Sequence, residues 1–312
     1  MASPQTAPQT PQAAPQTAAD RGSHRNREND DPGLAQPYSS SGKKKTRIIT
    51  ITSGKGGVGK TNMSVNMAIA FARLGKKVVV MDADLGLANV NVLLKMIPQY
   101  SLYHVVKKQK TIHDILVETE YGISIVAGAS GFSQIVNMSE EDRQNFITQL
   151  DTLSFADIII IDTSAGVSSN VLDFIAAADD AVIVTTPETT AIADAYSIIK
   201  IIAMEYEPVD LKLKLVINRA KSAGEAKSVA DRLIDIVGKF LYMKIDYLGF
   251  VYDDPAVPNS VRLQKPFVVM DPKSKASICI QHLAERIDKN KPVDSSGISN
   301  VFKKLFNRSW GA

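Results

Sequence analysis

Cysteine, long apolar runs and a strong excess of one charge are scarce or missing in this chain of 312 residues. The single cysteine, Cys279, excludes an intramolecular disulfide framework, and its apolar helical surroundings predict a position in the core. No apolar run approaches the ~18 residues needed to span a bilayer, and the opening Met1-Ala2-Ser3-Pro4-Gln5 lacks the basic and apolar regions of a secretory signal. We therefore expect a cytoplasmic protein. The net charge of +3 is too small to indicate nucleic-acid binding by itself.

Residues 1–45 differ in composition from the rest of the chain. They are rich in Pro, Gln, Ala, Thr and Ser, and Leu34 is their only aliphatic residue larger than Ala. Such a segment cannot bury enough apolar area to offset its conformational entropy, so we predict that it is disordered.

From residue 46 onward, strand patterns alternate with helix patterns. Strands are predicted at 47–52, 77–81, 123–126, 157–161, 181–185, 212–217 and 247–250, and helices at 60–74, 139–151, 168–177, 190–205, 224–239 and 274–287. The run Ile158-Ile159-Ile160-Ile161 is apolar on both faces, as buried parallel strands are. The alternation predicts an α/β fold over residues 46–288, a single doubly wound, mostly parallel sheet with helices on both faces. Ligands of such sheets bind beyond the carboxyl ends of the strands.

A glycine-rich loop separates the first predicted strand from the first predicted helix. Gly54 and Gly59 bracket four residues and Lys60-Thr61 follow, which completes the G-x-x-x-x-G-K-[ST] pattern of a phosphate-binding loop. Its glycines let backbone N–H groups turn inward, and the helix N-terminus adds partial positive charge. We expect Lys60 to reach the β- and γ-phosphates and Thr61 to hold Mg²⁺. The predicted nucleotide-binding loop comprises Gly54, Lys55, Gly56, Gly57, Val58, Gly59, Lys60 and Thr61.

A second lysine, Lys55, follows the first glycine, where an ordinary phosphate loop needs no cation. With it, the loop resembles the deviant phosphate loop of the MinD/ParA family of dimerising ATPases, and the resemblance covers about residues 46–290. It implies that Lys55 crosses a dimer interface to the phosphates of the partner, so that ATP joins a homodimer and Lys55 acts in catalysis with Lys60. On residue chemistry alone, Lys55 could be only a solvated charge. The lone cysteine excludes the multi-cysteine cluster sites of iron–sulfur carriers that share this loop.

Carboxylates follow two of the predicted strands. Asp82 and Asp84 come after the strand at 77–81, and Asp162 closes the strand at 157–161 in the Walker-B manner, which contacts Mg²⁺ directly or through water. The resemblance implies that Asp84 orients the attacking water, that Asp82 helps to hold the magnesium shell and the first switch, and that 162–168 form a second switch. Helix capping by the first pair and a simple turn after Asp162 are the alternatives.

The adenine site is predicted at the end of a later strand. The Asn218 side chain has a donor and an acceptor, which suit an adenine edge. By resemblance, Asn218 reads the base, Arg219 stacks against it, and the loop 252–257 closes the other side.

Several longer strings point to one branch of the family. Asp82-Ala83-Asp84-Leu85-Gly86-Leu87-Ala88-Asn89-Val90 and Val257-Pro258-Asn259-Ser260-Val261-Arg262 look like the FlhG branch, also called FleN or YlxH, which regulates flagellar number and placement. This implies as partners an FlhF-type GTPase and, in some lineages, flagellar switch-complex or transcription-activator proteins. The short Asp-Gln-Ala-Glu-Arg-Leu-Arg-like helix with which many members stimulate the GTPase is not found in residues 1–45.

The C-terminal residues form an amphipathic pattern after a flexible linker at 289–297. In residues 298–312 the apolar residues share one helical face and the basic residues lie beside it, which is typical of a helix that binds anionic lipid at the inner face of the cell membrane. The predicted membrane residues are Ile298, Val301, Phe302, Lys303, Lys304, Leu305, Phe306, Arg308 and Trp310. Docking of this helix on its own domain or on a partner is the alternative.

The leading interpretation is a slow, regulatory ATPase that dimerises on ATP, binds the membrane reversibly and controls flagellar assembly. A division-site selector of the MinD type has the same chemistry with different partners. A ParA-type partition or transcription-linked ATPase would need a basic surface for DNA, and Lys212, Lys214 and Lys221 are too scattered to establish one.

Overall fold

The computed structural model of the chain describes residues 46–84, 89–128, 139–206, 212–290 and 297–308. The predictions for residues 1–45, for 291–296 of the linker and for Trp310 lie outside the described residues. Within the described residues, none of the helices has the length and apolar character to cross a bilayer.

One sheet runs through the described part of the chain, in the order β3-β4-β2-β5-β1-β6-β7-β8. Its strands are β1 (Arg47–Ser53), β2 (Val78–Ala83), β3 (Leu116–Glu118), β4 (Ser124–Val126), β5 (Ile158–Ala165), β6 (Asp180–Thr185), β7 (Leu213–Ala220) and β8 (Ile245–Tyr252). All pairs are parallel except β3 with β4. The seven predicted strands are confirmed, and β3 is an unpredicted addition whose three residues are too few to show a period.

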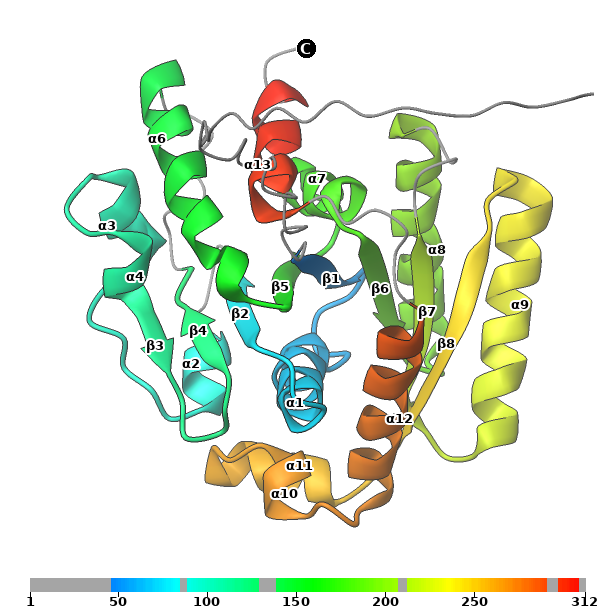
Figure 1. Cartoon of the computed structure of the whole chain (residues 1–312). Helices are drawn as coiled ribbons and strands as arrows, with labels where there is room; N and C mark the ends of the chain where they lie inside the picture. The colour runs from blue at the N-terminus through cyan, green and yellow to red at the C-terminus, as the bar shows by residue number, and fades with distance from the viewer. Residues whose placement is uncertain (1–45, 85–88, 129–138, 207–211, 291–296, 309–312) are drawn as a thin grey trace, which may run out of the picture. The chain divides into compact units, whose positions relative to one another are not determined.

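Helices surround this sheet (Figure 1). They are α1 (Lys60–Arg73), α2 (Asn89–Leu93), α3 (Leu102–Val106), α4 (Ile112–Ile115), α6 (Glu140–Asp151), α7 (Ser169–Ala177), α8 (Thr189–Glu205), α9 (Ala223–Leu241), α10 (Ala256–Leu263), α11 (Phe267–Met270), α12 (Lys275–Lys289) and α13 (Gly297–Arg308). Three long helices begin after a serine, because the hydroxyls of Ser139, Ser222 and Ser274 accept a hydrogen bond from an amide of the first turn.

Alternating residues of the long strands pack on opposite faces of the sheet. On β1, Ile49 packs with α1 and α12, whereas Ile48 faces the opposite side with α6 and α7. Strands β6 and β7 likewise share the second side with α8 and α9. Both faces are therefore covered, as a parallel sheet requires, and the doubly wound α/β prediction is confirmed. Cys279 on α12 is partly buried against the first core.

A buried ion cluster joins the amino ends of three strands, β1, β6 and β7, to the end of α12. The Arg47 guanidinium lies 2.6 Å from an Asp180 carboxylate oxygen and donates to the carbonyl oxygens of Ile287 and Asn290 at 2.6 and 2.8 Å. Lys214 approaches the same carboxylate at 3.4 Å. The attraction of Arg47 and Lys214 for Asp180 offsets the desolvation cost of burying these charges.

Helix α13 does not stand apart from the domain. Its apolar face packs against α6 and α7, and Ile298, Val301, Phe302 and Phe306 are buried, with exposed fractions of 2%, 0%, 1% and 5%. The Phe302 ring meets the rings of Phe146 and Phe174 edge-on, at centroid distances of 5.4 and 5.8 Å. For residues 297–308 the structure therefore shows the alternative that the sequence left open, a helix docked on its own domain. An amphipathic period specifies an apolar face, and here the domain itself covers that face.

Candidate functional site

The glycine-rich loop lies where the sequence predicts it, between the end of β1 and the start of α1. Gly57 and Gly59 have positive φ angles of 76° and 99°, which residues with a side chain rarely adopt. A Cβ atom on Gly59 would lie 2.5 Å from Nδ2 of Asn218. No side chain caps the start of α1, so the amides of its first turn are available to an anionic ligand.

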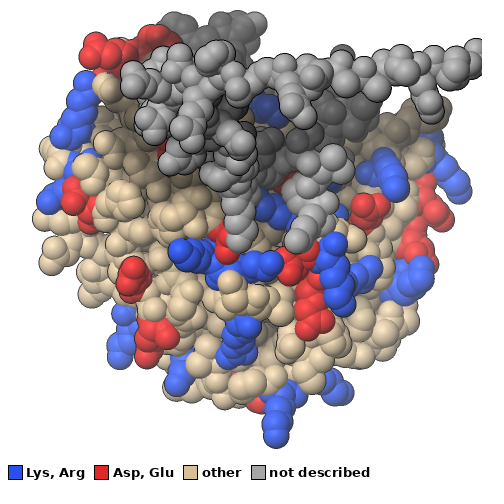
Figure 2. Space-filling model, viewed as in Figure 1, with Lys and Arg blue, Asp and Glu red and all other residues tan. Residues whose placement is uncertain are grey.

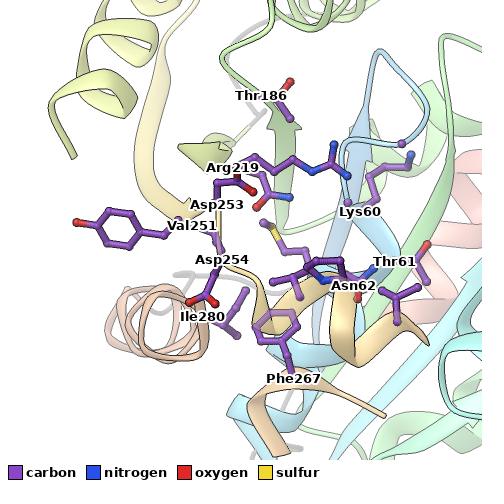
Figure 3. A pocket seen from close by; sticks show the side chains of 18 of the residues that line it. Lys60, Thr61, Asn62, Thr186, Arg219, Val251, Asp253, Asp254, Phe267 and Ile280 are labelled. Carbon is purple, nitrogen blue, oxygen red and sulfur yellow. The ribbon is translucent and has the colours of Figure 1, made fainter. Parts of the chain in front are cut away.

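A cavity of about 1200 Å³ opens beside this loop and collects most of the predicted site. Its wall includes Gly56, Gly57, Gly59, Lys60, Thr61, Asp84, Asn218 and Arg219, together with Tyr252, Asp253, Asp254 and Val257 of the predicted base loop. Figure 3 shows Arg219 extending toward the side that holds Lys60 and Thr61. The wall does not include Gly54, Lys55, Val58, Asp82 or Asp162. Residues from separate strand ends therefore meet at one edge of the sheet, as predicted.

Lys60 lies on the cavity wall and is buried, with an exposed fraction of 8%. Burial lowers the pKa of Lys60, and the charges of Asp162 and Asp84 oppose this effect. A cation on the cavity wall is suited to bind a phosphate group.

Asp162 offers an unsatisfied oxygen at the magnesium position that the sequence predicts. It lies on β5 with an exposed fraction of 1%, and one oxygen accepts a hydrogen bond of 2.7 Å from the Ser64 hydroxyl. The other oxygen is buried without a hydrogen-bond partner. Burial raises the pKa of Asp162 to about 6, although Ser64, Thr61 and Lys60 lower it. A buried acceptor of this kind beside Thr61 fits a hard cation such as Mg²⁺.

Asp82 connects the end of β2 with the start of α2. Its two carboxylate oxygens accept hydrogen bonds from the amides of Asp84 and Val90, at 3.1 and 3.3 Å, on either side of residues 85–88. Burial raises the pKa of Asp82 to about 7, and the neighbouring charge of Asp162 adds to this effect. The predicted roles of Asp82 in the first switch and in the magnesium shell both stay predictions.

The Asp84 carboxylate lies on the cavity wall and is held by a residue to which the sequence analysis assigned no role. Nδ2 of Asn89 donates to Asp84 at 3.0 Å, and Asn89 also lines the cavity. Ser64 was missed as well, although it is four residues after Lys60 and therefore lies on the same face of α1.

Asn218 uses one of its two N–H donors inside the protein. Its Nδ2 donates to the carbonyl oxygen of Val58 at 2.7 Å, which braces the phosphate loop against the end of β7. One N–H of the amide and the side-chain oxygen are left to contact a base, so the predicted adenine contact stays a prediction. Arg219 has a positive φ of 55°, an unusual conformation for a residue with a side chain.

The Lys55 side chain contacts the start of α8 in the same chain. Its ammonium group lies 3.1 Å from the Glu188 carboxylate and 2.7 Å from the Thr190 hydroxyl. Both partners belong to the start of α8, which the sequence analysis did not connect with this lysine.

Comparison with known proteins agrees with this geometry. The model of the CobQ/CobB/MinD/ParA nucleotide-binding domain matches residues 49–267. The chain is 35% identical over 243 residues to the antiactivator FleN of Pseudomonas aeruginosa, covering 78% of this chain and 86% of that protein. It is 32% identical over 267 residues to the flagellum site-determining protein YlxH of Helicobacter pylori, covering 83% and 90%. The solved structure of the septum site-determining protein MinD of Pyrococcus horikoshii with Mg-ADP is similar, with a TM-score of 0.62, 26% identity and coverage of 78% and 96%.

Proposed function

This chain belongs to the CobQ/CobB/MinD/ParA nucleotide-binding family, and from that premise we propose that it is an ATP-driven switch that regulates the number and placement of flagella. It is an ATPase that works with Mg²⁺. The observation that carries the proposal is the likeness to two flagellar regulators, FleN and YlxH, over most of this chain and most of theirs.

The site residues have distinct tasks in this proposal. The amides at the start of α1 and the ammonium of Lys60 hold the phosphates, while Thr61 and Asp162 supply oxygen ligands to Mg²⁺. The metal, when bound, neutralises charge that develops on the phosphate oxygens. Asp84, held in place by Asn89, orients the attacking water at the mouth of the cavity. Phosphoryl transfer needs positioning more than a strong base, so a carboxylate suffices.

Membrane binding through residues 298–312 would require α13 to leave its groove. In the docked state the apolar face that would enter the lipid is buried, although Lys303 and Lys304 stay exposed. Each basic residue near anionic lipid contributes about 1 kcal/mol. One short helix would therefore bind marginally, whereas two helices on a dimer gain avidity of roughly 10²–10⁴. ATP-driven dimerisation would then favour the membrane and hydrolysis would return the monomer.

The distribution of surface charge gives less support to the alternative of a DNA-associated ATPase. Figure 2 shows basic and acidic side chains interspersed over the described residues of the face in view, without a continuous basic area. The flagellar reading implies an FlhF-type GTPase as partner, with switch-complex or transcription-activator proteins as further candidates.

Co-sedimentation with anionic liposomes tests the switch. The full chain and a chain ending at Pro292 are compared under Mg-ATP and Mg-ADP. We expect pelleting only with ATP and only with the intact C-terminus. Pelleting that is the same with either nucleotide, or no pelleting of the full chain, would contradict the membrane cycle. The protein would then be an ATPase whose C-terminal helix only stabilises its own domain.

A further inference from the structure

The second lysine of the phosphate loop is engaged within its own subunit. The Lys55 ammonium contacts Glu188 at 3.1 Å and Thr190 at 2.7 Å, and the two charged side chains have exposed fractions of 36% and 58%. Glu188 also lies on the wall of the nucleotide cavity. The lysine is thus held at the mouth of the site and does not extend freely from the surface.

The backbone of the loop is fixed against the same helix. A Cβ atom on Gly54 would lie only 2.1 Å from the carbonyl oxygen of Asp194, so the loop packs closely on the second turn of α8. The Ser53 hydroxyl donates to the carbonyl oxygen of Lys55 at 2.7 Å. These contacts determine where the Lys55 side chain starts, and they bring it within reach of Glu188 and Thr190.

The position is electrostatically marginal for a cation. Lys55 sits at the N-terminus of α8, where the helix dipole is positive and no side chain caps the free amides. Its attraction to this place therefore comes from Glu188 and from the hydroxyl of Thr190. A partly exposed pair of this kind shifts an equilibrium by up to about fivefold. The contact can hold the lysine, yet a stronger anion such as a bound phosphate can replace Glu188 as the partner of the Lys55 ammonium.

We propose that Glu188 and Thr190 are positioning residues that retain Lys55 in its own subunit, and that a second copy of this chain must draw the lysine away before an ATP dimer can form. The inference rests on the proposed function, because it takes Lys55 to act on the phosphates of the partner. The intramolecular contact then restrains dimerisation. Since a symmetric dimer releases two lysines, full removal of the restraint lowers the dimer dissociation constant by up to about 25-fold.

Two readouts on the full chain test the proposal. The first is the rate at which an amine-acylating reagent labels Lys55 in the nucleotide-free protein, followed by mass spectrometry. The second is the dimer dissociation constant with Mg²⁺ and an ATP analogue that has a non-cleavable β–γ bond. The variants are Glu188→Gln and Thr190→Ala, with Thr190→Ser as the conservative rescue and Thr189→Ala as the matched control. Thr190→Ala changes no charge, so it separates release of Lys55 from altered repulsion of the nucleotide.

We expect Glu188→Gln and Thr190→Ala to raise the labelling rate severalfold and to tighten the dimer, while Thr190→Ser and Thr189→Ala behave as the unaltered protein does. An unchanged labelling rate in the first two variants would overturn the retention of Lys55. Faster labelling with an unchanged or higher dimer dissociation constant would contradict the claim that the Lys55 contact restrains dimerisation. If the unaltered protein does not dimerise with the analogue, the proposed switch fails, and labelling still shows whether Lys55 is retained.

Discussion

Phe146 on α6 is the position at which docking of α13 can be weakened without changing α13 itself. Its exposed fraction is 2%, and its ring packs edge-on against Phe302 at 5.4 Å. Truncation of a buried Phe to Ala costs about 3–5 kcal/mol, and an aromatic pair contributes about 0.5–1.5 kcal/mol beyond its buried area. Because Phe146 contacts both the domain and α13, we assign about 2 kcal/mol of the loss to the docked helix. Phe146→Ala should therefore favour undocking about 30-fold.

Hydrogen exchange and liposome binding measure the consequence. In Phe146→Ala, the amides of α13 should exchange about 30-fold faster, and the nucleotide-free protein should pellet with anionic liposomes because its apolar face is released more often. Leu102→Ala is the matched control, since Leu102 is buried in the same core on α3. The Phe146→Ala variant of a chain ending at Pro292 should not pellet.

Two results would refute this reasoning in different ways. Unchanged exchange in α13 would mean that Phe146 does not hold the helix, and the energetic account of docking would be wrong. Faster exchange without pelleting would leave docking intact and remove the membrane as the destination of the released helix.

Further predictions concern the catalytic carboxylates and the buried ion cluster. Asp84→Ala should abolish ATP hydrolysis in a phosphate-release assay while nucleotide-dependent dimerisation persists, and hydrolysis at the normal rate would show that another residue orients the water. The pKa of Asp82 is raised from 3.8 to about 7, so the folded state takes up a proton as the pH falls from 8 to 6 and the unfolded state does not. In urea titrations of the nucleotide-free protein, the free energy of unfolding should then rise by about 1 kcal/mol over this interval relative to Asp82→Asn. An equal change of the free energy of unfolding in both proteins would contradict this prediction. Arg47→Ala leaves Asp180 buried with only a longer contact to Lys214, so the free energy of unfolding should fall by about 3–5 kcal/mol, and a loss below 1 kcal/mol would refute the cluster as a stabilising element.

Local sequence patterns were enough to predict the sheet and the phosphate loop. Adjacent residues of a buried strand, such as Ile48 and Ile49, point to opposite faces and are both apolar, so the need for two helical layers is already present in the chain. The loop from Gly54 to Thr61 binds through its backbone, and the glycines that permit this conformation are visible as a motif. The short helices α2, α3, α4, α10 and α11 were not predicted, because four to eight residues are too few to show a helical period.

Contacts between distant segments were decided only by the tertiary structure. The sequence indicates that residues 298–306 have an apolar face, but a helical period is the same whether lipid or α6 and α7 cover that face. The motif indicates that Lys55 is a second cation, but its contact with Glu188 spans more than a hundred residues and depends on how β6 leads into α8. Asn218 likewise braces the phosphate loop because β7 ends beside it. Periodicity and motifs arise from neighbours along the chain, whereas the partner of a side chain is set by which elements the sheet order places next to one another.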